Sequence, residues 1–327
     1  MIAEEPRVDP ARVTELAQSL ETELARLIVG QKELVRDTVI ALIAGGHLLL
    51  EGVPGLGKTV LVRSLSQALK LSFARIQFTP DLMPADIVGT NVIREEKGRR
   101  EFQYQAGPLF ANLVLADEIN RATPKTQAAL LEAMQESQVT VEGQTFPLAP
   151  PFLVIATQNP IELEGTYPLP EAQLDRFLLR VGVGYPGPEA EQEILRRRRQ
   201  RRTDAASVPT IVTRNDLLAM QAALEDVFVS DALERYVVAL AQATRTDHRV
   251  ALGASPRGTL AVLKLARAEA ALRGREFVLP DDVKAVAVPA LAHRLVLKPE
   301  LWVSRTTTTQ VVEALLRQVP TPPAEPA

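Results

Sequence analysis

The stretch Gly52-Val53-Pro54-Gly55-Leu56-Gly57-Lys58-Thr59 decides the fold that we predict for this chain of 327 residues. It matches the pattern GxxxxGK[ST] at every defined position, and it lies between an apolar run that ends at Glu51 and a stretch with helical periodicity. Glycines let backbone N–H groups face phosphate oxygens, and the start of a helix adds positive potential. The sequence therefore predicts a strand, a phosphate-binding loop and a helix, in that order.

Two side chains of this loop have predicted contacts with ATP and its metal ion. Lys58 would reach the β- and γ-phosphates, and the Thr59 hydroxyl would ligate Mg²⁺. The alternative is a glycine-rich turn whose lysine is only solvated, but the order of strand, loop and helix favours the phosphate site. The residues expected to bind the nucleotide here are Gly52, Val53, Pro54, Gly55, Leu56, Gly57, Lys58, Thr59 and Val60.

Short apolar runs alternate with helical patterns on both sides of the loop. Strands that are buried on both faces of a parallel sheet are continuously apolar. We therefore predict an α/β fold with a mostly parallel sheet, whose strands are His47–Glu51, Arg75–Phe78, Leu113–Asp117, Phe152–Thr157 and Phe177–Val183. Two further segments, Asn91–Leu109 and Gln138–Phe146, are predicted β-hairpins that turn at Glu95–Gly98 and at Glu142-Gly143.

The alternation stops at Tyr185-Pro186-Gly187-Pro188, and helical patterns follow. Helix starts are marked at Ser230, at Ser255-Pro256 and at Pro280-Asp281-Asp282. The length of the chain suits two domains. We predict a nucleotide-binding domain over residues 1–188, of which 1–12 are flexible, an all-helical domain over 189–319 and a disordered, proline-rich tail over 320–327.

The apolar run Leu113–Ala116 ends in two carboxylates, Asp117 and Glu118. Asp117 can hold Mg²⁺, directly or through water, and Glu118 is placed to polarise a water molecule that attacks the γ-phosphate. The two acids could instead cap the following helix, but their pairing with a phosphate loop favours the catalytic interpretation. After the next apolar run, the Asn159 amide could touch both the γ-phosphate and that water, although Asn before Pro160 alone indicates only a turn.

The composition argues against several other classes of protein and site. The chain has no cysteine, which excludes disulfides and thiolate metal sites and fits a reducing compartment. The apolar stretches are too short or interrupted to span a bilayer and no signal-like region occurs in the first 30 residues, so we expect a cytoplasmic protein. His47, His248 and His293 lack ligand spacing, and no Ser–His–Asp or HExxH pattern supports a protease or metalloenzyme.

Six arginines occur within Arg196–Arg202. Such a run can contact nucleic acid, form the solvated face of a helix, or meet an acidic surface of another subunit. The chain has a net charge of −3, and no aromatic residues are interleaved with these arginines. Both observations argue against nucleic acid as the partner of this arginine cluster.

Taken in order, the motifs resemble the AAA+ ATPases and, among them, the MoxR family. The most specific strings are Leu115–Ala122 (LADEINRA), Ala156–Pro160 (ATQNP) and Leu169–Phe177 (LPEAQLDRF), and the resemblance extends from Ile28 to about Leu316. It implies a five-stranded AAA+ P-loop core, β-hairpin inserts and a helical lid. It also implies a ring, usually a hexamer, with ATP at each junction between subunits.

The same resemblance identifies further functional residues. Asn159 is identified as the sensor-1 residue, Arg176 as an arginine finger that reaches the γ-phosphate bound by a neighbouring subunit, and Arg257 as sensor 2 on the lid. Val29 and Gly30 would lie beside the adenine. The two hairpins would be the helix-2 insert and the pre-sensor-1 insert, lining the pore or one face of the ring.

Electrostatics agrees with both transferred arginine roles. A cation from the next subunit would stabilise the charge that develops on the transferring phosphoryl group. An ion pair of Arg176 with Asp175 or Glu171 is the ordinary alternative. Arg257 lies at a predicted helix start, where a cation is unfavourable to the helix dipole unless an anion is close.

The function expected from the residues and the resemblance is Mg²⁺-dependent ATP hydrolysis by a homo-oligomer. The family resemblance implies a chaperone-like motor that remodels or activates a partner protein, in some cases one with a von Willebrand factor A domain. A DNA-dependent motor, a magnesium-chelatase-like subunit and a nucleotide-gated scaffold are the alternatives. Glu118 argues against the scaffold, because a scaffold has no need of a base for water.

Overall fold

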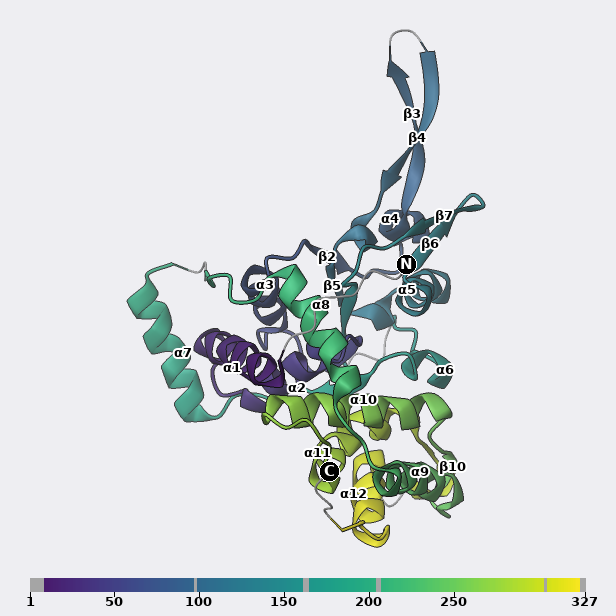
Figure 1. Ribbon diagram of the computed structural model, residues 1–327. Coiled ribbons are helices and arrows are strands. Elements are labelled where there is room, and N and C mark those ends of the chain that lie inside the picture. The colour runs from purple at the N-terminus through teal and green to yellow at the C-terminus, as the bar shows by residue number, and fades with distance from the viewer. Residues whose placement is uncertain (1–8, 97–98, 161–164, 204–206, 303–304, 324–327) are drawn as a thin grey trace.

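The computed structural model describes residues 9–96, 99–160, 165–203, 207–302 and 305–323. A parallel sheet with helices on both faces lies in the middle of the molecule (Figure 1). A long hairpin projects from one end, and a group of helices from the C-terminal part of the chain forms the other end.

Five parallel strands form the central sheet in the order β2-β5-β8-β1-β9. Each of the five predicted apolar runs is a strand, and the sheet is parallel throughout. The strands are β1 (Leu48–Glu51), β2 (Phe73–Gln77), β5 (Leu113–Asp117), β8 (Leu153–Gln158) and β9 (Leu179–Gly182).

The side chains of these strands alternate between two apolar clusters, one on each face of the sheet. Leu48 and Leu50 enter one cluster, which also contains side chains of the N-terminal and C-terminal helices, whereas Leu49 enters the other. Because both faces are covered by helices, successive residues can all be apolar, and the strands are continuous hydrophobic runs.

Local capping signals fix where several of the twelve helices in the described residues begin. The predicted starts at Ser230, Ser255-Pro256 and Pro280 are confirmed, and the hydroxyls of Ser230 and Ser255 accept hydrogen bonds from the first turn. The helices are α1 (Pro10–Leu27), α2 (Lys32–Ile43), α3 (Lys58–Ala68), α4 (Pro84–Val88), α5 (Pro124–Glu136), α6 (Glu171–Leu174), α7 (Pro188–Arg201), α8 (Arg214–Ala223), α9 (Asp231–Thr246), α10 (Pro256–Leu272), α11 (Pro280–Leu291) and α12 (Thr308–Gln318).

The expected flexible segment over residues 1–12 is too long. Pro10 to Arg12 form the first turn of α1, and the Asp9 carboxylate caps that turn by accepting from the Ala11 N–H at 2.9 Å. An aspartate before a proline at the first helical position is a strong start signal, and it outweighs the polar composition of the segment. Residues 1–8 and 324–327, at the two ends of the chain, lie outside the described residues.

Both predicted hairpins are present. The first pairs β3 (Gly89–Glu96) with β4 (Arg99–Ala106), and the second half of its predicted turn, residues 97–98, lies outside the described residues. It projects far from the body of the molecule (Figure 1). The second pairs β6 (Gln138–Val141) with β7 (Gln144–Pro147). Its turn residues Glu142 and Gly143 have φ of 49° and 79°, the two positive values that a tight hairpin turn uses.

The C-terminal part of the chain is helical, with one small addition. A two-stranded antiparallel pair, β10 (Val250–Leu252) and β11 (Val296–Leu297), lies among its helices. The predicted boundary near residue 188 falls in the link between β9 and α7. The division into a nucleotide-binding domain and a lid stays a prediction, because the two parts share one apolar cluster.

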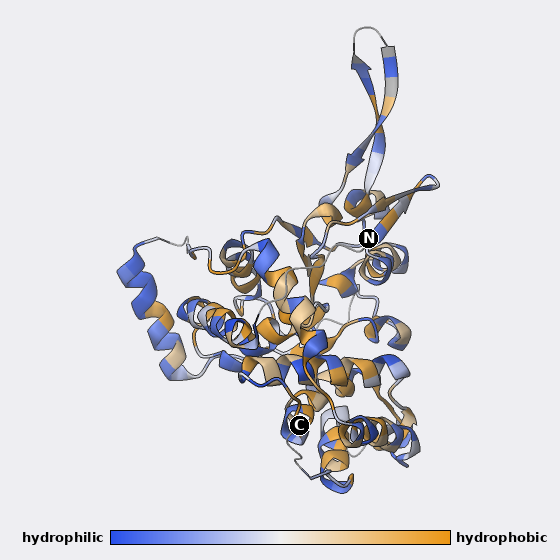
Figure 2. Cartoon of the chain, in the orientation of Figure 1, coloured by the Kyte–Doolittle hydropathy of each residue, from blue (hydrophilic) through white to orange (hydrophobic). Residues whose placement is uncertain are grey.

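Helix α7 carries the arginine cluster and projects from the molecule with no buried residue (Figure 1). Most residues along it are hydrophilic (Figure 2). Arg197 donates to the carbonyls of Ala25 and Arg26 at the end of α1 and pairs with Glu193, at 2.6 Å. Arg196 also pairs with Glu193, at 2.7 Å. Part of the cluster therefore serves contacts within this chain, since a cation stabilises the C-terminal end of a helix.

Among the residues that the structure describes, no helix combines the length and the apolar character needed to cross a membrane.

The His47 side chain, just before β1, is hydrogen-bonded to β8 and to α5, and we expect it to make the stability of the protein depend on pH. Its Nδ1 accepts from the Val154 N–H at 3.0 Å, so its Nε2–H donates to the Met134 carbonyl at 2.9 Å. The ring is half-buried, and its desolvation lowers the pKa of His47 from 6.5 to about 4. Between these values the unfolded chain binds the extra proton, so stability must fall as the pH falls from 6.5.

We expect wild type to lose about 2 kcal/mol from this ring between pH 6.5 and pH 5. His47→Gln should be less stable at neutral pH, because it loses the paired hydrogen bonds, but its stability should decline less in that interval. Urea unfolding at several pH values measures both effects. His248→Gln, at a side chain that is 88% exposed, is the control and should keep the wild-type slope. Equal slopes for His47→Gln and wild type would contradict the prediction.

Candidate active site

The candidate site lies where three neighbouring strands end. The phosphate loop follows β1, Asp117 ends β5, and Asn159 directly follows β8. Because β8 lies between β5 and β1 in a parallel sheet, these carboxyl ends share one edge, with Asn159 between the loop and the acids. This edge is where open α/β sheets bind ligands.

The phosphate loop has the backbone conformation that only glycine adopts without strain. Gly55 and Gly57 have φ of 85° and 80°, and a side chain added at either would meet no atom within 4 Å. Those positions therefore require glycine for conformation and leave open space for a ligand. Gly52 is different: a Cβ there would approach the Val183 carbonyl oxygen to 2.5 Å, so it packs beneath the loop.

Lys58 is the first residue of α3, and its side chain folds back over the loop. The ammonium donates to the Gly52 carbonyl at 2.5 Å. Burial lowers the pKa of Lys58, while the carboxylates of Asp117 and Glu118 act in the opposite direction. A buried cation beside an open glycine-lined space is suited to phosphate oxygens.

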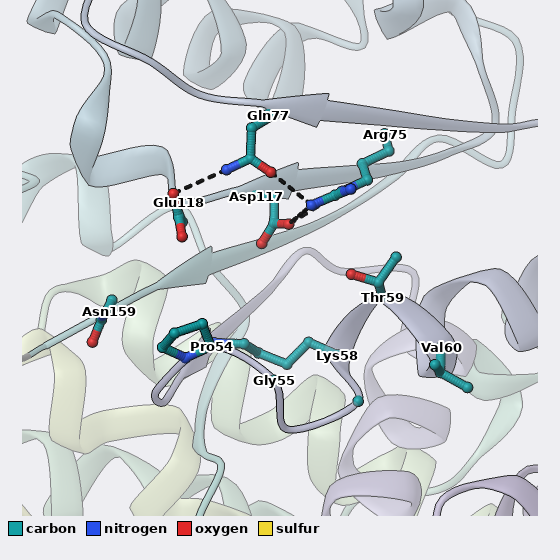
Figure 3. A pocket seen from close by; sticks show the side chains of 11 residues that line it. Pro54, Gly55, Lys58, Thr59, Val60, Arg75, Gln77, Asp117, Glu118 and Asn159 are labelled. Atoms are coloured by element: carbon teal, nitrogen blue, oxygen red, sulfur yellow. Dashed lines mark hydrogen bonds and ion pairs between the residues drawn. The ribbon is translucent and has the colours of Figure 1, made fainter. Parts of the chain in front are cut away.

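A cavity of about 330 Å³ brings most of the predicted residues together (Figure 3). Its polar lining combines the loop and the helix start with the acids and the amide from the strand ends. The predicted residues that line it are Pro54, Gly55, Gly57, Lys58, Thr59, Val60, Asp117, Glu118 and Asn159.

A second cavity, of about 460 Å³, adjoins the first, because Pro54, Gly55, Gly57 and Val60 line both. It has the more apolar lining of the two, and residues of α7 line one side of it. Its lining includes the predicted residues Val29 and Leu56, together with Leu27, Ile28, Tyr185, Ile194 and Arg201. An apolar space next to the phosphate cradle suits a nucleobase.

Gly30, Gly52 and Val53 do not line either cavity, although we predicted all three as nucleotide contacts. Gly30 lies in the turn between α1 and α2 with φ of 78°, and a Cβ there would come within 2.5 Å of the Ala190 Cβ. The glycine is therefore required by a tight turn that touches α7. The sequence pattern could not distinguish Gly30 from Val29, and of these two neighbours only Val29 lines the second cavity.

The two acids are oriented by a buried threonine that the sequence analysis did not single out. The Thr157 hydroxyl donates to Asp117 Oδ1 at 2.6 Å and accepts from the Glu118 N–H at 2.9 Å. Glu118 itself has left-handed backbone angles, φ 56° and ψ 49°. A glutamate in that region costs about 1–3 kcal/mol, and such strain persists where surrounding contacts enforce it.

Three further polar side chains hold the carboxylates, and Figure 3 shows two of them, Arg75 and Gln77. Arg75 pairs with Asp117 Oδ2 at 2.6 Å and also donates to Gln77, while Gln77 donates to Glu118 Oε2 at 2.9 Å. Arg121 donates to the same Glu118 oxygen at 2.9 Å. Sequence reasoning missed Arg75 and Gln77 because their position depends on the β2–β5 register, which opposes Gln77 and Asp117. The signal available in the sequence was the presence of two polar residues, Arg75 and Gln77, in a short strand that was expected to be apolar.

The two other predicted arginines do not line either cavity. Arg176 follows α6, and its guanidinium contacts the Leu131 carbonyl at 3.3 Å and the Gln135 side chain on α5. Arg257, in the first turn of α10, has Nη1 at 3.7 Å from Asp175 Oδ2. Arg257 thus lies near the Asp175 carboxylate, whereas the guanidinium of Arg176, the next residue in the sequence, contacts α5. Both arginines lie outside these two cavities of their own chain.

Comparisons with known proteins give a consistent result. Residues 47–179 match the family model described as "ATPase family associated with various cellular activities (AAA)", and residues 242–315 match the model "AAA lid domain". The chain is 47% identical to the protein named Chaperone MoxR1 of Mycobacterium tuberculosis, covering 92% of this chain and 81% of that protein. It is 31% identical to Protein MoxR of Methylorubrum extorquens, covering 93% of each.

A solved structure resembles the whole fold. The crystal structure of a putative ATPase from Cytophaga hutchinsonii superimposes with a TM-score of 0.89 at 41% identity. The match covers 96% of this chain and 97% of that one.

Proposed function

Because this chain belongs to the MoxR family of AAA+ ATPases, we propose that it works in the cytoplasm as a ring of identical subunits. The proposed ring, of six subunits, couples Mg²⁺-dependent ATP hydrolysis to the remodelling or activation of a partner protein. One observation carries this proposal. The cavity contains the phosphate loop and both acids, whereas Arg176 and Arg257 lie outside it in the same chain.

The cavity residues have distinct proposed tasks. The loop backbone, Lys58 and Thr59 bind the phosphates, and Glu118 takes the proton from the attacking water while Asn159 orients that water. A hydroxyl and a carboxylate in one cavity, Thr59 and Asp117, are the hard oxygen ligands that fit Mg²⁺. When bound there, the ion would neutralise charge on the phosphate oxygens. Arg75 neutralises Asp117 in the structure described here, so it must yield that carboxylate to the metal.

Two arginines from the next subunit would complete the site. Arg176 follows Asp175 in the sequence, and Arg257 Nη1 lies 3.7 Å from the Asp175 carboxylate. A neighbouring subunit that docks this region against the open phosphate cavity would bring two cations to the γ-phosphate. Cations aimed at the charge of the transition state are a main source of catalysis in phosphoryl transfer. A single subunit is then nearly inactive, and assembly controls turnover.

The projecting β3–β4 hairpin is the proposed contact with the partner protein. Ile93 and Phe102 are paired across its strands and are 63% and 78% exposed. Exposed large apolar side chains on a projecting element are typical of protein-binding surfaces. The partner includes, in our proposal, a protein with a von Willebrand factor A domain.

A trapping experiment tests this function. Glu118→Gln with ATP should form stable rings and retain the partner, whereas Lys58→Ala should release it, because only the first variant keeps ATP bound. Native mass spectrometry gives the ring size, and the retained protein, once purified, should stimulate ATP turnover of wild type. Exchange of Ile93 and Phe102 for serine should abolish that stimulation but leave basal turnover unchanged.

The alternative functions give different outcomes in the same assay. Stimulation by single- or double-stranded DNA near physiological salt, lost when four arginines of α7 become serine, would support a DNA-dependent motor instead. Salt must be controlled because any basic helix binds DNA weakly at low ionic strength. A retained protein that turns out to be a chelatase subunit would support the chelatase alternative.

A further inference from the structure

Arg294 is a buried arginine that donates hydrogen bonds to one short segment of the chain and to the preceding helix α11. It ends the 3₁₀ turn η4 (Ala292–Arg294) that follows α11, and its side chain is 2% exposed. Its Nε donates to Asp175 Oδ1 at 2.8 Å, and its Nη2 donates to the carbonyls of Asp175 and Phe177 at 3.3 and 2.6 Å. Its Nη1 donates to the carbonyls of Leu178, at 3.2 Å, and Ala290.

The segment that accepts these hydrogen bonds, residues 175–178, links α6 to β9 and contains no helix or strand. Buried carbonyls in such a segment need partners from elsewhere, and the planar fork of an arginine can supply several at once. The neighbouring His293 adds a hydrogen bond between its Nε2 and the Phe177 carbonyl, at 3.1 Å. The Phe177 ring, which is fully buried, anchors the same segment in the second apolar cluster.

Asp175 also contacts two residues at the start of α10. The Ser255 hydroxyl, which caps α10, also reaches Asp175 Oδ2 at 2.9 Å. Arg257 Nη1 lies 3.7 Å from the same oxygen. One carboxylate is therefore held by η4 and by the start of α10, two parts of the lid that are far apart in the sequence.

Arg176 lies in the sequence between two residues that Arg294 binds. Its neighbours Asp175 and Phe177 are both bound through their main chain by Arg294, so the backbone of Arg176 is fixed relative to the lid. Its side chain is half-buried and donates to acceptors of α5, the Leu131 carbonyl and Gln135, which it must leave to reach another subunit. A fixed backbone lets such a side chain reach a neighbouring site reproducibly.

We propose that Arg294, acting with Asp175, is the positioning residue of the Arg176 finger, so that the lid of one subunit sets the catalytic geometry of the next subunit's ATP site. This inference rests on the proposed function, in which Arg176 acts in trans. The guanidinium fork is essential because a lysine would keep the charge but could not reach the Asp175 carboxylate together with the carbonyls of residues 175, 177 and 178.

The test uses Arg294→Lys and, as a second variant that keeps the side-chain shape, Asp175→Asn. A misplacement of about 1 Å can cost about 10²-fold in rate, so we expect turnover to fall by about 10²-fold while the ATP affinity stays within about twofold of wild type. The matched controls are Arg275→Lys and Asp282→Asn, which disrupt a buried ion pair of 2.5 Å inside the lid, far from residues 175–178 in the sequence. Thermal unfolding shows whether the two pairs of variants are equally destabilised, and the controls should keep wild-type turnover.

Mixed rings separate positioning from general damage. Two differently tagged variants are co-expressed and purified through both tags, so every ring contains both. Arg294→Lys mixed with Glu118→Gln should regain activity, because the Glu118→Gln subunits carry well-placed fingers for intact sites. Arg294→Lys mixed with Arg176→Ala should stay slow, because every finger is defective. Damage confined to the ATP site of the Arg294→Lys subunit would reverse this pattern. The mixture with Glu118→Gln would stay slow, the mixture with Arg176→Ala would regain activity through the intact fingers of the Arg294→Lys subunits, and that result would overturn the proposal.

Two further results have distinct meanings. Wild-type turnover in both Arg294→Lys and Asp175→Asn, with Arg176→Ala inactive, overturns the positioning role and leaves the finger intact. Wild-type turnover in Arg176→Ala itself overturns the proposed function, and the positioning role with it.

Discussion

Replacing Arg176 with alanine is expected to lower ATP turnover by about 10³-fold or more while changing ATP affinity by less than about twofold. The residue lies outside the nucleotide cavities of its own chain, so its loss removes nothing that holds ATP there. In the proposed mechanism it removes a cation that meets the phosphoryl group only in the transition state, and such a loss lowers turnover without weakening binding. Turnover under saturating ATP and calorimetric affinity measure the two quantities separately.

A complementation experiment decides whether the finger acts on a neighbour. Rings of Arg176→Ala alone and of Glu118→Gln alone should both be inactive. In mixed rings, an Arg176→Ala subunit with an intact base can receive the finger of a Glu118→Gln neighbour, and activity should return. Mixed rings that stay inactive would show that the finger acts within its own chain or that turnover needs every site intact. Arg267→Ala, which removes an ion-paired arginine of α10, is the control and should keep wild-type turnover.

Glu118→Gln and Lys58→Ala are expected to fail at different steps. Loss of a general base lowers turnover by about 10²–10⁴-fold, and glutamine keeps the shape and the ATP affinity. Lys58 is the buried cation of the phosphate cradle, and charged hydrogen bonds are worth about 1.5–3 kcal/mol. Its removal should therefore weaken ATP binding by about 10–10²-fold.

The two variants are compared by calorimetry and by phosphate release. Glu132→Gln, on the exposed side of α5, is a matched carboxylate control and should behave as wild type. Unchanged ATP affinity in Lys58→Ala would remove that lysine from the phosphate site. Normal turnover in Glu118→Gln would mean that another group activates the water, and the Thr157-supported acid pair would then need a different role.

Much of the site could be predicted because it depends on local patterns and on one rule of parallel sheets. The apolar runs fix the strands, and the carboxyl ends of adjacent parallel strands meet at one edge. Lys58, Thr59, Asp117, Glu118 and Asn159 therefore converge without any knowledge of the register.

Contacts between distant segments could not be predicted in this way. Gln77 reaches Glu118 only because β2 and β5 pair in one register, and a one-residue slip would turn it to the other face. Arg294 reaches Asp175 across 119 positions of sequence, and nothing near either residue indicates the other. Thr157 is hidden at the end of an apolar strand, where a threonine is also an ordinary strand residue.

The apolar cluster shared by the sheet and the lid helices has a mechanical consequence. A lid that swung away from the sheet during each cycle would expose side chains of both parts to water, at about 25 cal/mol for each Å² uncovered. In the proposed ring, each subunit would therefore be stiff along this seam, and movement would be concentrated at the contacts between one subunit and the next. A stiff subunit would transmit a small displacement at the γ-phosphate, and the long projecting β3–β4 hairpin would convert a slight rotation of the subunit into a larger displacement of Ile93 and Phe102.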